Sequence, residues 1–322
     1  MSKPMTAKNL QSSIRTLQRT WARLHADPPQ LLYHYTDAQG LLGMLKTHRL
    51  WASNRRFMND PTETQYAATL IRTLLDSDET ARYVAKQIKD EKLREVILDK
   101  VREGVSQNLT AYLDFDEHYL ACFCENGDLL SQWRGYGSVG GGYALGFEAR
   151  ALGVVFYTNQ QKPEPVLRRC LYNQKEQKKW SREWIRFIAD WVTLCCETPP
   201  GQKAPNDYFD LGWSSFSWFL SESLRCFKHP AYKEEREWRV IQFGTAPTGA
   251  RAVEPNFRAA RRGIVEYIEL DLPSAKDRLP LQTINYGPTL DANVSDQSLK
   301  LLCQGKGYDN VSITKSRVPF AG

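Results

Sequence analysis

Residues 31–46 read L-L-Y-H-Y-T-D-A-Q-G-L-L-G-M-L-K, and the interpretation of the chain starts from this stretch. Leu31–Thr36 is rich in aromatic and other strand-forming residues, which predicts a β-strand. Thr36 and Gln39 have the spacing of a capping box, and leucines recur at helical spacing over 41–45. We therefore predict a strand followed directly by a helix that ends near residue 46.

Outward from this unit, helical and strand-like patterns alternate irregularly, without the even βαβ rhythm of a doubly wound sheet. Residues 7–26 have apolar residues every three or four positions, which predicts an N-terminal helix. The sequence therefore predicts an α+β fold. We expect residues 1–30 to form a helix packed on the body. We expect residues 31–322 to form a single domain with a split sheet and helical insertions at about 62–107 and 174–228.

The remaining elements are predicted from the same patterns. Asp60, Pro61 and Glu63 have the residue types of an N-cap, a first helical position and a capping-box partner. The predicted strands are 50–52, 118–124, 142–147, 167–172, 237–243, 265–270, 281–285 and 311–315, and the other predicted helices are 128–134, 175–196, 208–227 and 296–303.

The composition is that of a globular protein. The chain has 322 residues, of which 42% are hydrophobic and 25% charged, so disorder is excluded for most of its length. No segment approaches the roughly 18 apolar residues that span a bilayer, and the first residues do not resemble a signal peptide. We expect a soluble, cytoplasmic protein with no membrane partner.

Basic residues are concentrated in two segments. Residues 1–60 hold nine Lys and Arg against three Asp, and residues 162–186 hold eight basic residues against three acidic ones. Such clusters could contact the phosphates of a nucleic acid. The alternative is a pair of helices whose basic faces are simply solvated.

Several familiar motifs are not supported. Residues 135–140, G-Y-G-S-V-G, match G-x-G-x-x-G, but a helical pattern precedes them and a strand follows, which is the reverse of a dinucleotide-binding loop. No serine-hydrolase or P-loop motif occurs. His118, Cys122 and Cys124 would share one strand face, where packing is the simpler explanation, so no metal is expected.

Three polar clusters remain where strands meet loops. In the predicted first strand, His34 faces away from Tyr33 and Tyr35, so its imidazole can point into a cleft. The alternative for His34 is a histidine with a satisfied hydrogen bond at a strand end. Near residues 132–142, six glycines between Gly135 and Gly146 allow close backbone approach to a ligand, or else form a flexible approach to a hairpin.

The third cluster is E-R-E-W-R at residues 235–239. If these residues enter a strand, Glu235 and Glu237 share one face. Two such carboxylates repel each other unless a cation lies between them, and an oxocarbenium ion is a cation of that kind. The alternative is an exposed strand start that is salt-bridged through Arg239.

The quoted motifs resemble a known family. Y-H-Y-T-D-A-Q-G-L-L-G-M-L, L-W-A-S, M-N-D-P-T-E, D-L-L-S-Q-W-R-G-Y-G and E-E-R-E-W-R-V follow one another over roughly residues 31–243, in an order similar to bacterial domain-of-unknown-function family 2971. The first block also resembles the start of ADP-ribosyltransferase-like folds, including DarT-type DNA modifiers and RNA 2′-phosphotransferases.

This second resemblance implies a split sheet of the ADP-ribosyltransferase-like type that binds NAD as its substrate. It implies that His34 contacts the ribose and the nicotinamide amide, and that Glu237 supports the cationic transition state, with Glu235 as the spare carboxylate. The S-T-S strand of such folds has no counterpart here. The implied NAD-binding residues are His34, Tyr35, Thr36, Arg55, Arg134 and Tyr136.

We therefore expect an NAD-dependent ADP-ribosyltransferase or NAD glycohydrolase that acts on a nucleic acid or a protein, in phage defence or as a toxin. The alternative is a non-catalytic nucleic-acid-binding module of a defence or regulatory system. A magnesium-dependent hydrolase or nuclease is a third class, and no acidic pair beyond Glu235 and Glu237 favours it.

Overall fold

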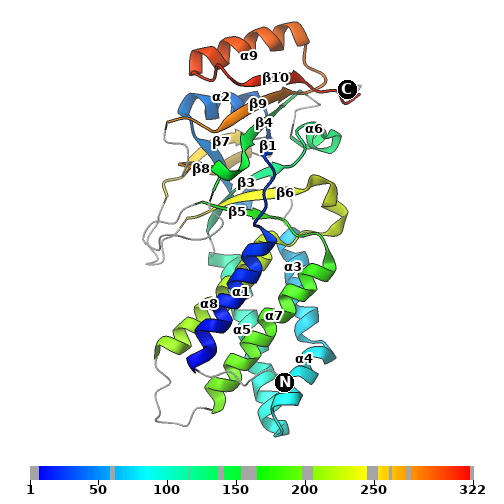
Figure 1. Cartoon of the computed structure of the whole chain (residues 1–322), viewed down its shortest axis with the longest axis vertical. Helices are drawn as coiled ribbons and strands as arrows, with labels where there is room; N and C mark the ends of the chain where they lie inside the picture. Colours follow the sequence, from blue (N-terminus) through cyan, green and yellow to red (C-terminus); the bar gives the residue numbers. More distant parts are fainter. Residues whose placement is uncertain are drawn as a thin grey trace. The chain divides into compact units, whose positions relative to one another are not determined.

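The fold is taken from a computed structural model, drawn in Figure 1. Its contacts divide the chain into two compact units, each built from three segments. The helical unit comprises residues 1–24, 60–116 and 171–231, and the sheet unit comprises residues 25–59, 117–170 and 232–322. The structure describes residues 7–58, 62–115, 117–136, 141–153, 165–197, 206–244, 253–260, 263–272 and 277–319.

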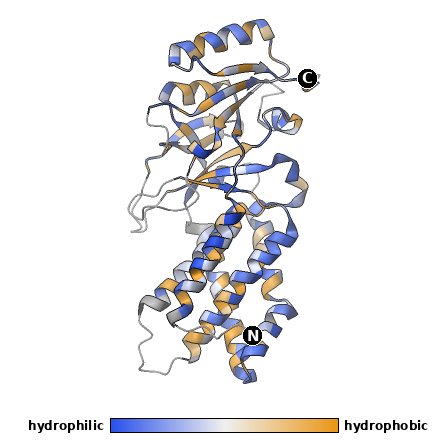
Figure 2. Ribbon diagram, in the orientation of Figure 1, coloured by the Kyte–Doolittle hydropathy of each residue, from blue (hydrophilic) through white to orange (hydrophobic). Residues whose placement is uncertain are grey.

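The helical unit joins the N-terminal helix with the two stretches predicted as insertions. Both hydrophilic and hydrophobic residues occur along its helices, as expected for helices that bury one face (Figure 2). The prediction of a single domain over residues 31–322 remains a prediction. The helices of the unit are α1 (Ala7–Leu24), α3 (Thr62–Leu75), α4 (Asp78–Gln87), α5 (Glu91–Phe115), α7 (Gln174–Glu197) and α8 (Asn206–Cys226).

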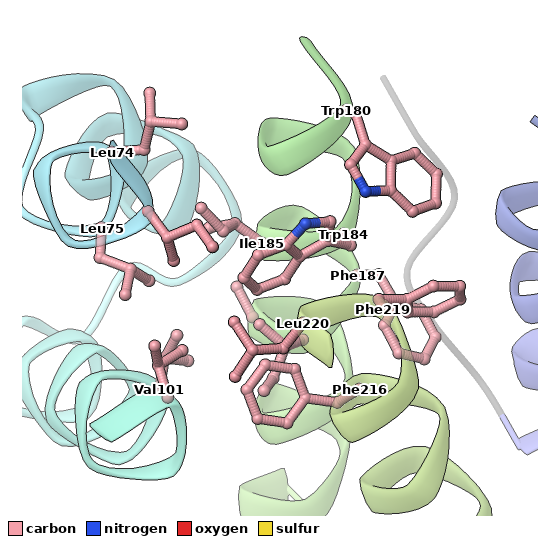
Figure 3. Close-up of a cluster of buried hydrophobic side chains, with 14 of the residues drawn as sticks. Leu74, Leu75, Val101, Trp180, Trp184, Ile185, Phe187, Phe216, Phe219 and Leu220 are labelled. Atoms are coloured by element: carbon pink, nitrogen blue, oxygen red, sulfur yellow. The ribbon is translucent and has the colours of Figure 1, made fainter. Parts of the chain in front are cut away.

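Aromatic side chains of α7 and α8 fill the core of the helical unit (Figure 3). The ring centroids of Trp180 and Phe219 lie 5.7 Å apart, and those of Trp184 and Phe216 lie 5.8 Å apart. All four side chains are buried. Leucines of α3 and Val101 of α5 complete the cluster in Figure 3, so the helices share one hydrophobic core.

The sheet unit is built on a mixed ten-stranded sheet, and its order along the main path is β10-β9-β4-β1-β3-β2-β8-β7. β6 pairs with β3 and β5 pairs with β6. The predicted α+β class is thereby confirmed. The strands are β1 (Leu31–Thr36), β2 (Leu50–Asn54), β3 (His118–Cys124), β4 (Tyr143–Glu148), β5 (Val166–Arg169), β6 (Glu237–Phe243), β7 (Asn256–Ala260), β8 (Gly263–Leu270), β9 (Leu281–Tyr286) and β10 (Ser312–Lys315).

Among the described residues, the sheet unit also contains three α-helices, two short 3-10 helices and most of a third, η4, whose first two residues belong to the helical unit. Side chains of α2 and α9, including Leu41, Leu45 and Leu299, are buried in the same hydrophobic cluster as residues of β1, β3 and β4. These elements are α2 (Ala38–Thr47), α6 (Leu130–Tyr136), α9 (Ala292–Lys306), η1 (Arg55–Phe57), η3 (Ala149–Ala151) and η4 (Pro230–Glu235).

Strand β3 pairs with the strands that surround the candidate functional site described below. β6 pairs with it along its whole length, from His118 to Cys124. The other edge of β3 is shared: β1 pairs there at Cys124, and β2 pairs at Leu120 and Tyr119. β1 and β2 therefore pair with different parts of this edge of β3. Between these pairings the backbone of β3 contacts side chains such as His34.

Most predicted elements are present, and the differences have local causes. Helix α2 begins one residue later than the predicted capping box, because Asp37 and not Thr36 is the N-cap and accepts a 2.8 Å hydrogen bond from the Gly40 nitrogen. Strand β7 was not predicted. The predicted helix start at Asp60 and Pro61 lies outside the described residues.

None of the described helices is long and apolar enough to cross a membrane.

Candidate functional site

A pocket of about 630 Å³ lies within the sheet unit, at the part of β3 that β1 and β2 share. Its size is in the range of small-molecule and cofactor sites. Residues of β1, β2, β3 and β7 form part of the wall, and further parts come from α2, η1, α6, η4, β8 and the start of β6. The pocket therefore collects side chains from segments that are far apart in the sequence.

His34 of β1 is fixed against β3. Its Nδ1 lies 2.9 Å from the carbonyl oxygen of Cys122, between the two places where β3 pairs with β1 and β2. A carbonyl oxygen only accepts hydrogen bonds, so Nδ1 carries the proton when the ring is neutral. In that tautomer Nε2 is the acceptor of the ring.

The surroundings of His34 keep its imidazole neutral. Burial, assisted by the positive charge of Arg258, lowers the pKa of His34 to about 4, although the hydrogen bond to Cys122 opposes the shift. The ring also lies against Phe123, with centroids 5.6 Å apart. At neutral pH His34 therefore presents a hydrogen-bond acceptor or a weak base, but not a cation.

The neighbouring tyrosines behave differently from each other. Tyr35 is buried, its ring lies 4.9 Å from that of Trp133 in an edge-to-face arrangement, and its hydroxyl donates to the Asn126 carbonyl. Tyr33 is only partly buried. Both still form part of the pocket wall, as does Thr36, so this wall includes the whole Y-H-Y-T segment.

Glu237 opens β6 and is buried in an ion pair. Its two carboxylate oxygens lie 2.8 Å from Nε and 2.9 Å from Nη2 of Arg239, which is also buried. The Cys170 thiol lies 3.6 Å from the same carboxylate. The alternative of a strand start that is salt-bridged through Arg239 is confirmed in its ion pair, but the pair is buried and not exposed. The two-point contact holds the carboxylate in one orientation.

Glu235 does not share a strand face with Glu237. It ends η4, and Arg236 then adopts a positive φ of 40°, which turns the backbone before β6 begins. The predicted pair of carboxylates on one strand face is therefore wrong. Both side chains nevertheless contribute to the wall of the same pocket.

The remaining predicted residues fall into two groups. Tyr136 at the end of α6 belongs to the wall and is 40% exposed. Arg134, two residues earlier, is exposed, and Arg55 in η1 is partly buried. Neither arginine contributes to the described wall of the pocket.

Arg258 is the residue that the sequence interpretation missed. It lies in β7 and contributes the cation of the described pocket wall. β7 and β8 form a hairpin that closes at Ala260 and Gly263, and Gly263 has a positive φ of 125°. Gly263, which stands between the run N-F-R-A-A and the strand-like run that follows it, was the signal that could have predicted this hairpin.

The described residues contain no group of three or more His, Cys, Asp or Glu side chains arranged to hold a metal ion.

The comparison with protein families gives one result. Residues 132–240 match the family described as "Protein of unknown function (DUF2971)". The DUF2971 match covers α6 through most of β6, and it includes Tyr136, Glu235 and Glu237 of the pocket wall. His34 and Arg258 lie outside the matched region. No curated protein and no solved structure matches the chain, so no link to ADP-ribosyltransferases is shown.

Proposed function

We propose that this protein binds NAD in the pocket of the sheet unit and cleaves the bond between ribose and nicotinamide. The ADP-ribosyl group passes to an acceptor or to water. The observation that supports the proposal is that His34 and Glu237, about two hundred residues apart in sequence, both line this one pocket.

The reaction asks for positioning more than for acid catalysis. The bond between the ribose C1′ and nicotinamide breaks, and its electron pair leaves with the neutral nicotinamide. The acceptor or water then forms a bond to C1′ and gives up a proton. The protein has to orient the dinucleotide and stabilise the positive charge that develops on the ribose.

His34 suits the orienting role. Its neutral ring donates through Nδ1 to the Cys122 carbonyl, which leaves Nε2 as an acceptor for a ribose hydroxyl or an amide N–H. Because the acceptor is a backbone carbonyl of β3, the ring is held by the sheet itself. This pre-organisation lowers the cost of ordering the site when substrate binds.

Glu237 and Glu235 are the carboxylates that would face the cationic ribose. Arg239 holds Glu237 rigidly but also offsets much of its charge. Glu235 contributes a second carboxylate to the wall, from the end of η4. The two-point contact with Arg239 fixes the orientation of the Glu237 carboxylate, and on that ground we assign the main electrostatic role to Glu237. Glu235 has a supporting role.

The acceptor is a nucleic acid or a protein side chain. Some of the basic residues that suggested nucleic acid have internal roles in this structure, because Arg182 and Arg186 of α7 both contact Glu79 of α4, and Arg168 is buried. These contacts reduce the basic surface available to phosphates. Lys175, Lys178 and Lys179 of α7 are exposed, so the rival nucleic-acid-binding module would depend on these lysines in this helix.

The test is release of nicotinamide from NAD by the purified full-length protein, with and without DNA, RNA and protein acceptors. We expect Glu237→Gln and His34→Ala to lower the rate by at least about 100-fold. Glu148→Gln is the matched control, because Glu148 is an exposed carboxylate of β4. It should retain the wild-type rate.

Folding of each variant is checked by thermal denaturation, since Glu237→Gln leaves a buried Arg239 without its charge partner. His34→Asn is the second variant, because its amide nitrogen can still donate to the Cys122 carbonyl while the Nε2 acceptor is lost. The proposal is wrong if folded variants release nicotinamide as fast as wild type, or if wild type releases none with any acceptor.

A further inference from the structure

Arg258 occupies an unusual position in the pocket wall. Its Nη2 donates a 3.0 Å hydrogen bond to the Ser53 hydroxyl of β2. Its guanidinium carbon lies 5.8 Å from the ring centroid of Trp51 and 5.9 Å from that of Tyr267. A hydroxyl and two aromatic rings therefore hold the guanidinium in place, and none of these partners neutralises its charge.

Two other arginines of the sheet unit, one buried and one half-buried, pair with carboxylates. Arg239 pairs with Glu237, and Arg49 pairs with Asp271. Among the described residues Arg258 makes no ion pair, and the nearest acidic influence on it is Asp37, whose carboxylate caps α2. Burial lowers the pKa of Arg258 and Asp37 opposes the shift, but an arginine remains protonated at neutral pH.

Two hydrogen-bond donors in this part of the wall have no acceptor among the described residues. Nε of Arg258 and Nε1 of Trp51 are both buried donors that meet no acceptor in the described part of the chain. Buried donors without acceptors are rare in folded proteins, because each one loses its hydrogen bonds to water. A bound group with a negative charge and several acceptor oxygens would neutralise the charge of Arg258 and accept hydrogen bonds from both donors.

We infer that Arg258, with Ser53 and Trp51, forms a phosphate-binding subsite that receives the phosphoryl groups of a nucleotide. This inference deepens the proposed function and rests on the same pocket. It moves phosphate recognition away from Arg55 and Arg134, which lie outside the described wall. The planar guanidinium of Arg258 can contact two phosphate oxygens at once, as arginine does in many phosphate sites.

Binding is tested by calorimetry on the full-length protein, with inorganic pyrophosphate, ADP and adenosine as probes. We expect pyrophosphate and ADP to bind, and adenosine to bind at least about tenfold more weakly than ADP, because a charged hydrogen-bonded contact is lost. Arg258→Gln should weaken pyrophosphate at least about tenfold. Arg150→Gln, at an exposed arginine of η3, is the matched control and should bind as wild type does.

Two further measurements keep the inference testable if Arg258→Gln does not fold. Asp37→Asn removes the carboxylate that opposes an anion in the wall, so it should strengthen pyrophosphate binding about two- to fivefold. In wild type, bound pyrophosphate should raise the pKa of His34 above its value without ligand, which NMR titration of the ring detects.

The subsite is refuted if folded Arg258→Gln binds pyrophosphate as wild type does, if Arg55→Gln or Arg134→Gln alone removes binding, or if wild type binds no anion. Failure of the proposed function gives a different result. Pyrophosphate and ADP would then still bind through Arg258, while no acceptor would support release of nicotinamide.

Discussion

At the scale of single residues, three polar groups of the pocket wall are positioned by specific partners. His34 is held by a backbone carbonyl, and Glu237 is held by Arg239. Arg258 is held by Ser53 and two rings. As a result His34 is neutral, Glu237 is paired with a cation, and Arg258 keeps its charge. The charge state of each group determines which ligand it can bind.

The depressed pKa of His34 makes the stability of the protein depend on pH. The unfolded chain protonates this ring near its ordinary pKa of 6.5, whereas the folded protein resists protonation until about 4. Unfolded protein therefore binds more protons in this window, so stability is retained above about 6.5 and is lost as the pH falls toward 4.

We expect His34→Asn to remove this component. Between pH 6.5 and 4 the free energy of unfolding of wild type should fall by roughly 3 kcal/mol more than that of the variant. Urea denaturation at both pH values measures the difference. The pKa of His25 is also lowered by burial. Its contribution to the pH dependence is the same in wild type and variant, so it does not affect the difference between them. Parallel pH profiles would show that His34 is not buried as described.

At the scale of elements, the N-cap of helix α2 is also part of the pocket wall. Asp37 accepts from the Gly40 nitrogen and lines the pocket, so one side chain ends β1, starts α2 and contributes charge to the wall. The start of this helix therefore affects both stability and ligand binding.

The cap can be tested separately from the charge. Asp37→Ala should lower the free energy of unfolding by about 1 kcal/mol, whereas Asp37→Asn, which keeps an oxygen that can accept from Gly40, should change it by only a few tenths. Chemical denaturation gives both values. Equal losses in the two variants would mean that the charge of Asp37, and not its capping bond, stabilises the fold.

At the scale of the whole molecule, the chain is divided between a helical unit with its own core and a sheet unit that holds the pocket. The helical unit contains a buried polar group, Glu222 of α8. It accepts a 2.7 Å hydrogen bond from Trp21 of α1 and lies 3.5 Å from Nη1 of Arg225. This contact joins the first helix to a helix some two hundred residues later.

We expect Glu222→Ala to lower the free energy of unfolding by roughly 3–5 kcal/mol, because it removes the carboxylate that pairs with the buried Arg225. Glu95→Ala, at an exposed position of α5, should change it by less than about 0.5 kcal/mol. Pyrophosphate affinity of folded Glu222→Ala should equal that of wild type, since the lining residues belong to the sheet unit. A matching loss of affinity would show that the units are coupled.

Local pattern in the sequence was enough to predict most elements and the α+β class. The periodicity of apolar residues predicted β1 and β6 with the bounds that the structure has, because these segments have strong local preferences. The same reasoning singled out His34 and Glu237. Strand β7 escaped because its short, largely exposed run, N-F-R-A-A, acquires its structure only by pairing with β8.

What only the tertiary structure decided is which charges remain available. At the level of the sequence, Arg134 and Arg55 were among the implied NAD-binding residues, and Glu235 was the spare for Glu237 on the same strand face. Folding paired Glu237 with Arg239, separated Glu235 from the strand, and left Arg258 in the pocket wall without a carboxylate among the described residues. Periodicity reports which face a residue occupies, but the neutralisation of a charge depends on partners brought close by folding of distant segments.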